Sequence, residues 1–256
     1  HLLTLINDVL DLSKIEAQKM ELYATSFHFS SFLQGVAEIF SIRADQKKIS
    51  FICQFDSDLP TGVSVDEKRL RQVLINLLGN AVKFTDHGAV TFKVKLCGHR
   101  IGNDSERITK IRFQVEDTGV GISSDYLDKI FMPFEQAGDL NNQAQGTGLG
   151  LAISQKILAL MDSGIHVNSQ NGEGSIFWFD VELTEVAEWS QIARISQKGT
   201  MMGFSGEPRK ILVVDDRWEN RSVAVNLLQP LGFDVVEAMN GKEGLEKAAE
   251  YYPDLI

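Results

Sequence analysis

Apolar side chains recur at helical spacing between Asp66 and Thr85. The residues that make this stripe are Leu70, Val73, Leu74, Leu77, Leu78 and Ala81. Such spacing predicts an amphipathic helix with one buried side. Its first turn carries Asp66 and Glu67, whose carboxylates favour the positive end of a helix dipole. The pattern therefore predicts a helix over residues 66–85.

Residues 1–22 also have a helical pattern, with two apolar seams. The first seam consists of Leu2, Leu5, Val9 and Leu12, and the second of Leu3, Ile6 and Leu10. Two adjacent seams make a stripe wide enough for a four-helix bundle rather than a two-stranded coil. A lone amphipathic helix of this length is marginally stable. We therefore expect this helix to form a homodimer with a second copy of the chain.

Short strands and helices alternate between residues 23 and 184. Alternating apolar and polar side chains, bounded by turn residues, predict strands at Ser26–Phe29, Ile49–Phe55, Val63–Val65, Ala89–Leu96, Ile108–Glu116, Ile165–Gln170 and Ser175–Leu183. Helices are predicted at residues 31–47 and 150–161, and a polar hairpin loop at residues 98–107. The predicted fold class is α+β, with helices covering one face of an antiparallel-rich sheet.

The pattern changes at residue 185. Residues 185–209 have no sustained period and contain Pro208, which predicts a linker. Ile211–Val214 is a continuous apolar run that is typical of a buried parallel strand. A helix at residues 219–228, a strand at Val235–Val236 and a helix at residues 242–250 are predicted to follow. Residues 210–256 are therefore expected to form the start of a doubly wound α/β domain.

Charge and cysteine content limit the class of function. The formal net charge is −10, which argues against nucleic acid as a main partner. Cys53 and Cys97 are too few for a disulfide framework and are expected in strands, as small apolar side chains in a reducing compartment. No run of about 18 apolar residues is present, so no membrane segment is predicted. We expect a cytoplasmic location, compatible with membrane attachment of a parent protein through upstream regions.

Residues suited to chemistry gather in three stretches. Asn76, Asn80 and Lys83 share one stripe of the helix at 66–85, although Asn is disfavoured inside helices because its amide competes with the backbone. The other two stretches are glycine clusters, Asp117–Ile122 (DTGVGI) and Gly146–Leu151 (GTGLGL). A glycine turn that opens a helix directs backbone N–H groups at an anion such as phosphate. The segment of about 25 residues between the clusters predicts a lid over a ligand.

Each stretch by itself has an ordinary alternative interpretation. The asparagines suit a polar surface, DTGVGI suits a turn at the end of a strand, and GTGLGL suits a tight packing corner. In the order NLLGNAVKFT, DTGVGI and GTGLGL, the three stretches resemble the ATP-binding domain of sensor histidine kinases. That family belongs to a superfamily shared with DNA gyrase, the Hsp90 chaperones and the MutL mismatch-repair proteins. MPFEQ at residues 132–136 resembles its phenylalanine motif, and GEG at residues 172–174 a further glycine turn.

The resemblance covers residues 23–184 and implies a two-layer α/β sandwich of the Bergerat type that binds ATP and Mg. Asp117 would accept a hydrogen bond from the adenine amino group, and Gly119 and Gly121 would let the backbone approach the base. Asn80, with Asn76, would hold Mg beside the phosphates, and Lys83 would offset phosphate charge. The implied phosphate-wrapping residues are Gly146, Gly148 and Gly150. The other residues assigned to the ATP site are Ile122, Phe131, Thr147 and Leu149.

Both ends of the chain resemble neighbouring modules of the same signalling systems. LINDVLDLSKIEAQKMEL is similar to the second helix of the dimerisation and phosphotransfer hairpin. Asp215 and Asp216 are similar to the acidic pair that binds Mg in receiver domains, with helix capping as the alternative. The phosphoacceptor histidine is expected before residue 1 and the receiver's acceptor aspartate after Ile256. We therefore interpret the chain as a piece of a longer protein, with no catalytic residue of its own and no such role for His1.

The predicted function is that of a hybrid sensor histidine kinase core. It would donate the ATP γ-phosphoryl to a histidine, for transfer to a receiver aspartate in cis or on a response regulator in trans. A non-catalytic signalling scaffold is one alternative, because the lid segment AGDLNNQAQ has no Arg or Lys. An ATPase of the gyrase or chaperone branch is another. It is disfavoured because Gln72 occupies the turn where that branch has its hydrolytic glutamate.

Overall fold

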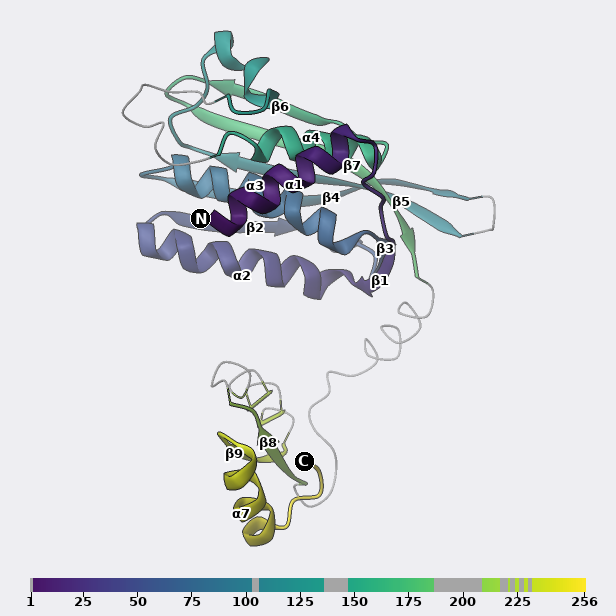
Figure 1. The fold of residues 1–256 in the computed structure, drawn as a ribbon, viewed down its shortest axis with the longest axis vertical. Coiled ribbons are helices and arrows are strands. Elements are labelled where there is room, and N and C mark those ends of the chain that lie inside the picture. The colour runs from purple at the N-terminus through teal and green to yellow at the C-terminus, as the bar shows by residue number, and fades with distance from the viewer. Residues whose placement is uncertain are drawn as a thin grey trace. The chain divides into compact units, whose positions relative to one another are not determined.

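The structure, a computed structural model, describes residues 2–102, 106–135, 147–186, 209–216, 221, 224–225, 228–229 and 232–256. The chain divides into two compact units, residues 1–190 and 191–256, which are described separately below (Figure 1). Within the described residues, no helix combines the length and the apolar character needed to cross a membrane.

The first unit is built on a sheet to which the described residues contribute seven strands. The strand order is β1-β3-β7-β5-β4-β2, and β6 pairs with β7. The pair β2–β4 is parallel, and the other pairs are antiparallel. The strand bounds are β1 (Thr25–His28), β2 (Ser50–Phe55), β3 (Gly62–Val65), β4 (Ala89–Ile101), β5 (Arg107–Asp117), β6 (Ile165–Gln170) and β7 (Gly174–Glu185).

Helices of the described part of the chain cover one face of this sheet (Figure 1). They are α2 (Phe29–Lys47), α3 (Glu67–Phe84) and α4 (Gly150–Leu160). Every residue of the predicted apolar stripe of α3 is buried, and Phe40 of α2 and Phe113 of β5 are fully buried in the same core. The predicted α+β fold with helices on one side of an antiparallel-rich sheet is confirmed.

Helix α3 begins where its sequence predicts. Asp66 is its N-cap, and its carboxylate accepts hydrogen bonds from the backbone N–H of Arg69 at 3.0 Å and of Tyr23 at 2.9 Å. A capping carboxylate satisfies N–H groups that have no partner inside the helix and stabilises it by about 1 kcal/mol. Because Asp66 also holds Tyr23, the start of α3 is tied to the segment that leads into β1.

The first helix is shorter than predicted. Helix α1 spans Leu2–Glu16, and the helix expected over residues 1–22 is therefore wrong in its last turns. Gln18 takes a left-handed conformation with φ 54°, and the N–H of Lys19 bonds to the carbonyl of Lys14 at 2.8 Å. This closes the helix as a left-handed cap does. Beyond it the chain buries Met20 in the core, a tertiary contact that helical periodicity does not reveal.

The hairpin of β4 and β5 is longer than predicted. Strand β4 continues past Leu96 to Ile101, so residues 98–101 are strand rather than loop. A register shift between Leu96 and Gly98 marks a bulge that carries the strand onward. Cys53 and Cys97 lie in β2 and β4, as expected, but both are exposed rather than part of an apolar layer.

The second unit contains the parallel pair β8 (Lys210–Val214) and β9 (Asp234–Ala238), and α7 (Gly241–Tyr251). Leu255 forms a parallel bridge with Ile211, so the chain is entering a further strand position beside β8. This order matches the predicted start of a doubly wound sheet. The helix predicted at residues 219–228 falls mostly outside the described residues, as do the predicted linker and the segment AGDLNNQAQ.

Candidate functional site

The asparagine stripe of α3 faces the start of α4. The side-chain N–H of Asn76 donates to the hydroxyl of Ser154 on α4 at 2.9 Å, and Ser154 is buried. The side-chain oxygen of Asn76 lies so close to Gly150 that a β-carbon at Gly150 would come within 2.1 Å of it. Asn76 therefore joins α3 to the glycine-rich start of α4.

Asn80 and Lys83 follow on the same stripe, toward the C-terminal end of α3. Both side chains are partly buried. The Lys83 ammonium lies 4.5 Å from the centre of the Phe84 ring, and burial lowers the pKa of Lys83. A partly desolvated ammonium gains more from an anion than a fully hydrated one does. The stripe thus presents an amide and a cation next to each other.

Asp117 ends β5, and its carboxylate is enclosed by hydrogen-bond donors. The backbone N–H of Gly119 donates to its Oδ1 at 2.9 Å, and Ser175 of β7 donates through its N–H and its hydroxyl. Burial raises the pKa of Asp117, and these donors oppose part of that rise. A carboxylate kept in a desolvated place by fixed donors is a candidate for recognising a ligand donor.

The glycines after Asp117 allow close backbone contacts on both sides of the loop. Gly121 has φ +67°, and a β-carbon there would lie 2.0 Å from the carbonyl oxygen of Gln170. A β-carbon at Gly119 would lie 2.3 Å from the carbonyl oxygen of Phe84, the last residue of α3. The N–H of Val120 donates to that oxygen at 3.3 Å. The loop is therefore fastened to the end of α3.

Ile122 is held at the other end of this loop, where its N–H donates to the Ser169 hydroxyl on β6 at 2.8 Å. The start of α4 is also shaped by its backbone. The carbonyl of Gly148, which has φ +68°, accepts the N–H of Phe134 at 3.0 Å. The Thr147 hydroxyl accepts the N–H of Leu149 at 3.2 Å, and Leu149 is fully buried.

The described site residues thus come from one face of α3, the loop at residues 117–122 and the segment at residues 147–150. Gly146 lies outside the described residues. Phe131 is partly buried and lines a cavity of about 550 Å³ with Leu127, Asp128, Met132, Gln155 and Val167. Neither Asn76 nor Asn80 lines that cavity, so the cavity does not include the asparagine stripe of α3.

The donor set fits Mg bound together with phosphates. No cluster of three or more His, Cys, Asp or Glu that could hold a metal occurs among the residues described. Mg needs no such cage, because it keeps several waters and takes substrate phosphate oxygens with one or two protein oxygens. The Asn80 amide oxygen suits that demand. The backbone N–H groups at the start of α4 suit the phosphates.

Asp215 and Asp216 follow β8 directly in the second unit. Asp215 is partly buried, and its backbone carbonyl accepts a hydrogen bond from the Arg221 guanidinium at 2.9 Å. Asp216 is exposed. Their position at the carboxyl end of a parallel strand is where ligands bind in open α/β sheets.

Several residues at the site were not singled out by sequence reasoning. Ser154, Ser169 and Ser175 contact site residues from α4, β6 and β7, and Asp11 of α1 contacts α3. The carboxylate of Asp11 pairs with Arg69 at 2.8 Å and accepts the Gln72 amide at 2.9 Å. The side-chain amide of Gln72, one turn before Asn76 on α3, therefore helps to hold α1 against α3. No local pattern marks these residues, because their partners are distant in sequence.

Comparison of the chain with known proteins finds a matching family and similar relatives. Residues 65–185 match the family described as histidine kinase-, DNA gyrase B-, and HSP90-like ATPase. The chain is 35% identical over 263 residues to hybrid signal transduction histidine kinase K of Dictyostelium discoideum, covering 100% of this chain and 21% of that protein. It is 36% identical over 256 residues to the aerobic respiration control sensor protein ArcB of Escherichia coli, covering 98% and 31%.

Two solved structures are also similar. The structure of full-length ShkA in complex with AMPPNP aligns with a TM-score of 0.60 and 31% identity, over 96% of this chain and 47% of that one. The histidine kinase AdeS of Acinetobacter baumannii aligns with a TM-score of 0.51 and 27% identity, over 69% and 75%. The curated relatives named above are much longer, since the chain spans 21% and 31% of their lengths.

Residues 65–185 are therefore an ATPase domain of the class shared by histidine kinases, DNA gyrase B and HSP90. Within that class, the similar proteins named above include a hybrid signal transduction histidine kinase and the histidine kinase AdeS.

Proposed function

We propose that this chain is the ATP-binding core of a hybrid sensor histidine kinase. It binds ATP with Mg and donates the γ-phosphoryl group to a histidine of the dimerisation hairpin. The intact protein passes that group to a receiver aspartate, in cis or on a response regulator in trans. Residues 23–184 form the catalytic domain in this proposal, residues 185–209 the linker and residues 210–256 the start of the receiver.

One observation carries the proposal. The asparagine stripe of α3 is bonded at one end to the start of α4, through Asn76 and Ser154, and at the other end to the loop after Asp117, through Phe84 and Val120. The three stretches singled out in the sequence therefore surround one face of one helix. Polar and glycine-rich segments that are joined in this way suit a ligand with a base at one end and phosphates at the other.

Each group has a chemical task that suits its surroundings. The Asp117 carboxylate accepts a hydrogen bond from the adenine amino group. This favours ATP over GTP, because guanine has a carbonyl at that position and two acceptors cannot form a hydrogen bond. Gly119, Gly121 and Ile122 form the backbone against the base. The N–H groups at Gly148 and Gly150, with Gly146, Thr147 and Leu149, receive the phosphates at the start of α4. Phe131 is partly buried and packs against the hydrophobic core.

Asn80 supplies an oxygen to Mg, and Asn76 fixes the helix that carries it. Mg, when bound, neutralises charge on the phosphates. Lys83 adds a cation beside them. Phosphoryl transfer needs little covalent chemistry from the protein, so positioning and charge stabilisation account for most of the rate. The acceptor histidine must be brought to the γ-phosphate by the helical hairpin to which α1 belongs.

Two further parts of the proposal concern partners. Helix α1 carries exposed apolar side chains at Ile6, Val9 and Leu10, and these support a homodimer through this helix. Asp215 and Asp216 stand at the carboxyl end of β8, which supports a receiver-type Mg site once that domain is complete.

The test is a calorimetric titration with AMPPNP in the presence and absence of Mg. We expect Mg to tighten binding and Asn80→Ala to abolish most of that gain, weakening affinity by roughly tenfold or more, as for loss of a hydrogen bond to a charged group. The matched control is Gln54→Ala, which removes an exposed amide from edge strand β2.

Absence of binding by the parent chain would overturn the kinase proposal in favour of a non-catalytic scaffold. Steady ATP hydrolysis without a histidine partner would favour the gyrase and chaperone branch instead. Equal loss of Mg dependence in Asn80→Ala and Gln54→Ala would remove the assignment of Asn80 to Mg.

A further inference from the structure

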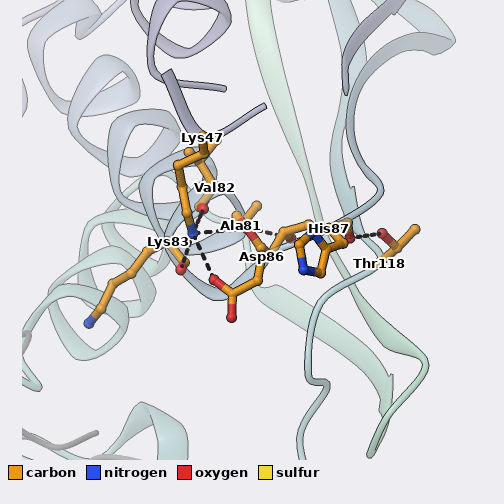
Figure 2. Close-up of polar contacts among 8 residues, drawn as sticks. Lys47, Ala81, Val82, Lys83, Asp86, His87 and Thr118 are labelled. Atoms are coloured by element: carbon orange, nitrogen blue, oxygen red, sulfur yellow. Dashed lines mark hydrogen bonds and ion pairs between the residues drawn. The ribbon is translucent and has the colours of Figure 1, made fainter. Parts of the chain in front are cut away.

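Lys47, the last residue of α2, donates hydrogen bonds to backbone carbonyls at the end of α3. Its ammonium donates to the carbonyl oxygens of Val82 at 3.0 Å, Lys83 at 2.9 Å and Thr85 at 2.9 Å. The Asp86 carboxylate lies 3.3 Å from the same nitrogen (Figure 2). An ammonium has three N–H donors, so the three carbonyls, which are closer, take the main share and Asp86 is a weaker fourth partner.

These bonds complete the C-terminus of α3. The last four carbonyls of an α-helix have no partner within the helix. In α3, the Lys47 ammonium donates hydrogen bonds to the carbonyls of Val82 and Lys83. The Thr85 hydroxyl donates to the carbonyl of Ala81 at 2.7 Å. The fourth carbonyl, that of Phe84, accepts a hydrogen bond from the N–H of Val120. A cation at this end also offsets the negative pole of the helix.

The same turn holds the loop assigned to adenine. Val120 bonds to the Phe84 carbonyl, and Gly119 lies against it. The Thr118 hydroxyl donates to the carbonyl of His87 at 3.3 Å (Figure 2). It also accepts a hydrogen bond from the N–H of Ala89 at 3.0 Å. The end of α3 and residues 118–120 are thus one bonded unit. In Figure 2 the Lys83 side chain points away from the Lys47 ammonium, so Lys47 acts on its backbone.

We propose that Lys47 is a positioning residue of the nucleotide site. Its ammonium fixes the last turn of α3, and through that turn it fixes Asn80, Lys83 and the Asp117–Gly121 loop in one arrangement. This inference rests on the proposed ATP function. Lys47 itself touches neither the nucleotide nor the metal in this account; it raises the population of the arrangement that binds them.

The test compares Lys47→Met, which keeps the length of the side chain but removes its donors, with Lys47→Arg and Lys47→Gln, which keep some donors. If loss of the ammonium leaves the competent arrangement about one-tenth populated, apparent affinity for AMPPNP with Mg falls about tenfold. We expect affinity to decrease in the order Lys47, Lys47→Arg, Lys47→Gln, Lys47→Met. Lys68→Met, which removes an exposed lysine from the first turn of α3, should leave affinity unchanged.

A second readout separates positioning from general destabilisation. Amide hydrogen exchange in nucleotide-free Lys47→Met should accelerate at Val120 and in the last turn of α3 while the sheet keeps its protection. Loss of stability alone would accelerate exchange throughout the core. If Lys47→Met is insoluble, Lys47→Gln takes its place in both measurements.

Parent-like affinity and parent-like exchange at Val120 in a folded Lys47→Met or Lys47→Gln variant would overturn the proposal. Should the parent chain itself fail to bind AMPPNP, the proposed function fails, but the exchange of Val120 still decides whether Lys47 holds the loop.

Discussion

Two opposing effects act on the pKa of the Asp117 side chain. Burial raises its pKa, while Gly119 and Ser175 donate hydrogen bonds that favour its ionised form. A folded-state pKa above the ordinary value of 3.8 means that ionised Asp117 costs stability at neutral pH. That cost disappears as the pH falls below the unfolded value. A ligand donor that formed a hydrogen bond to the ionised carboxylate would offset this cost.

Asp117→Asn should therefore separate stability from binding. At neutral pH we expect the variant to keep or gain thermal stability, because a buried charge is removed. We expect it to bind AMPPNP roughly tenfold or more weakly, because a hydrogen bond to a charged acceptor is lost. In the parent, affinity should decline as the pH falls through the raised pKa of Asp117. The variant should show no such decline, as measured by titrations across that pH range.

Asp58→Asn, in an exposed turn, is the control for removing one negative charge. A parent and an Asp117→Asn variant with the same affinity and the same pH profile would remove Asp117 from the site.

Sequence reasoning at the residue scale identified side chains but not their partners. The sequence predicts that Asn76 helps Asn80 to hold Mg, but it does not reveal that the Asn76 amide donates a hydrogen bond to Ser154, which is 78 positions away. Ser154 and Ser175 are ordinary serines in the sequence, and only the register of α4 on α3 and of β7 on β5 brings them to the site. Such pairings depend on tertiary structure and have no local signature.

At the scale of elements, α1 docks on α3 through an ion pair with little exposure. The side chains of Arg69 and Asp11 are 14% and 17% exposed, and Leu12 is buried beside them. Burial raises the pKa of Asp11, but the hydrogen bonds from Arg69 and Gln72 outweigh it, so its pKa lies below the ordinary value. Asp8, one turn earlier, lies 3.5 Å from the Thr147 hydroxyl at the start of the α4 segment.

Asp11→Asn is expected to weaken the docking of α1 on α3. Loss of the charge should weaken docking by about 1 kcal/mol, because the Asn oxygen can still accept a hydrogen bond from Arg69 but no longer as a charged acceptor. Because the folded pKa of Asp11 is lowered, its contribution is present above the unfolded value of 3.8 and is lost as the pH falls through the folded pKa. Hydrogen exchange of the α1 amides measures this, with Glu16→Gln as the exposed control.

Faster exchange of α1 in Asp11→Asn than in Glu16→Gln is the expected outcome. Equal exchange in the two variants would show that apolar contacts such as Leu12 hold the helix without the ion pair.

Element boundaries were predictable where local chemistry sets them. Asp66 caps α3 and the stripe of leucines is buried, so the predicted and observed helices agree to within a residue or two. Helix α1 ends early because Met20 enters the core and Tyr23 bonds to Asp66, two contacts with distant residues. Strand β4 runs on because β5 pairs with it beyond the bulge.

On the scale of the first unit, the two faces of the sheet explain why it has two layers. Along β5, Ile111, Phe113 and Val115 face the helices and are buried. The alternate residues carry ion pairs with neighbouring strands, Arg112 with Asp180 at 2.7 Å and Glu116 with Lys93 at 2.6 Å. A polar outer face needs no further layer to cover it. The alternation was visible in the sequence, which is why the fold class was predictable without knowing the order of strands.

The central claim is that the α3 stripe, the loop after Asp117 and the start of α4 form a single nucleotide site. Titration of the isotope-labelled chain with AMPPNP and Mg, followed by amide NMR, tests it most directly. We predict that residues 76–84, 117–122 and 147–151 shift together and fit one dissociation constant. Shifts confined to one of these stretches, shifts centred instead on the cavity at Leu127 and Met132, or no shifts at all would contradict the account.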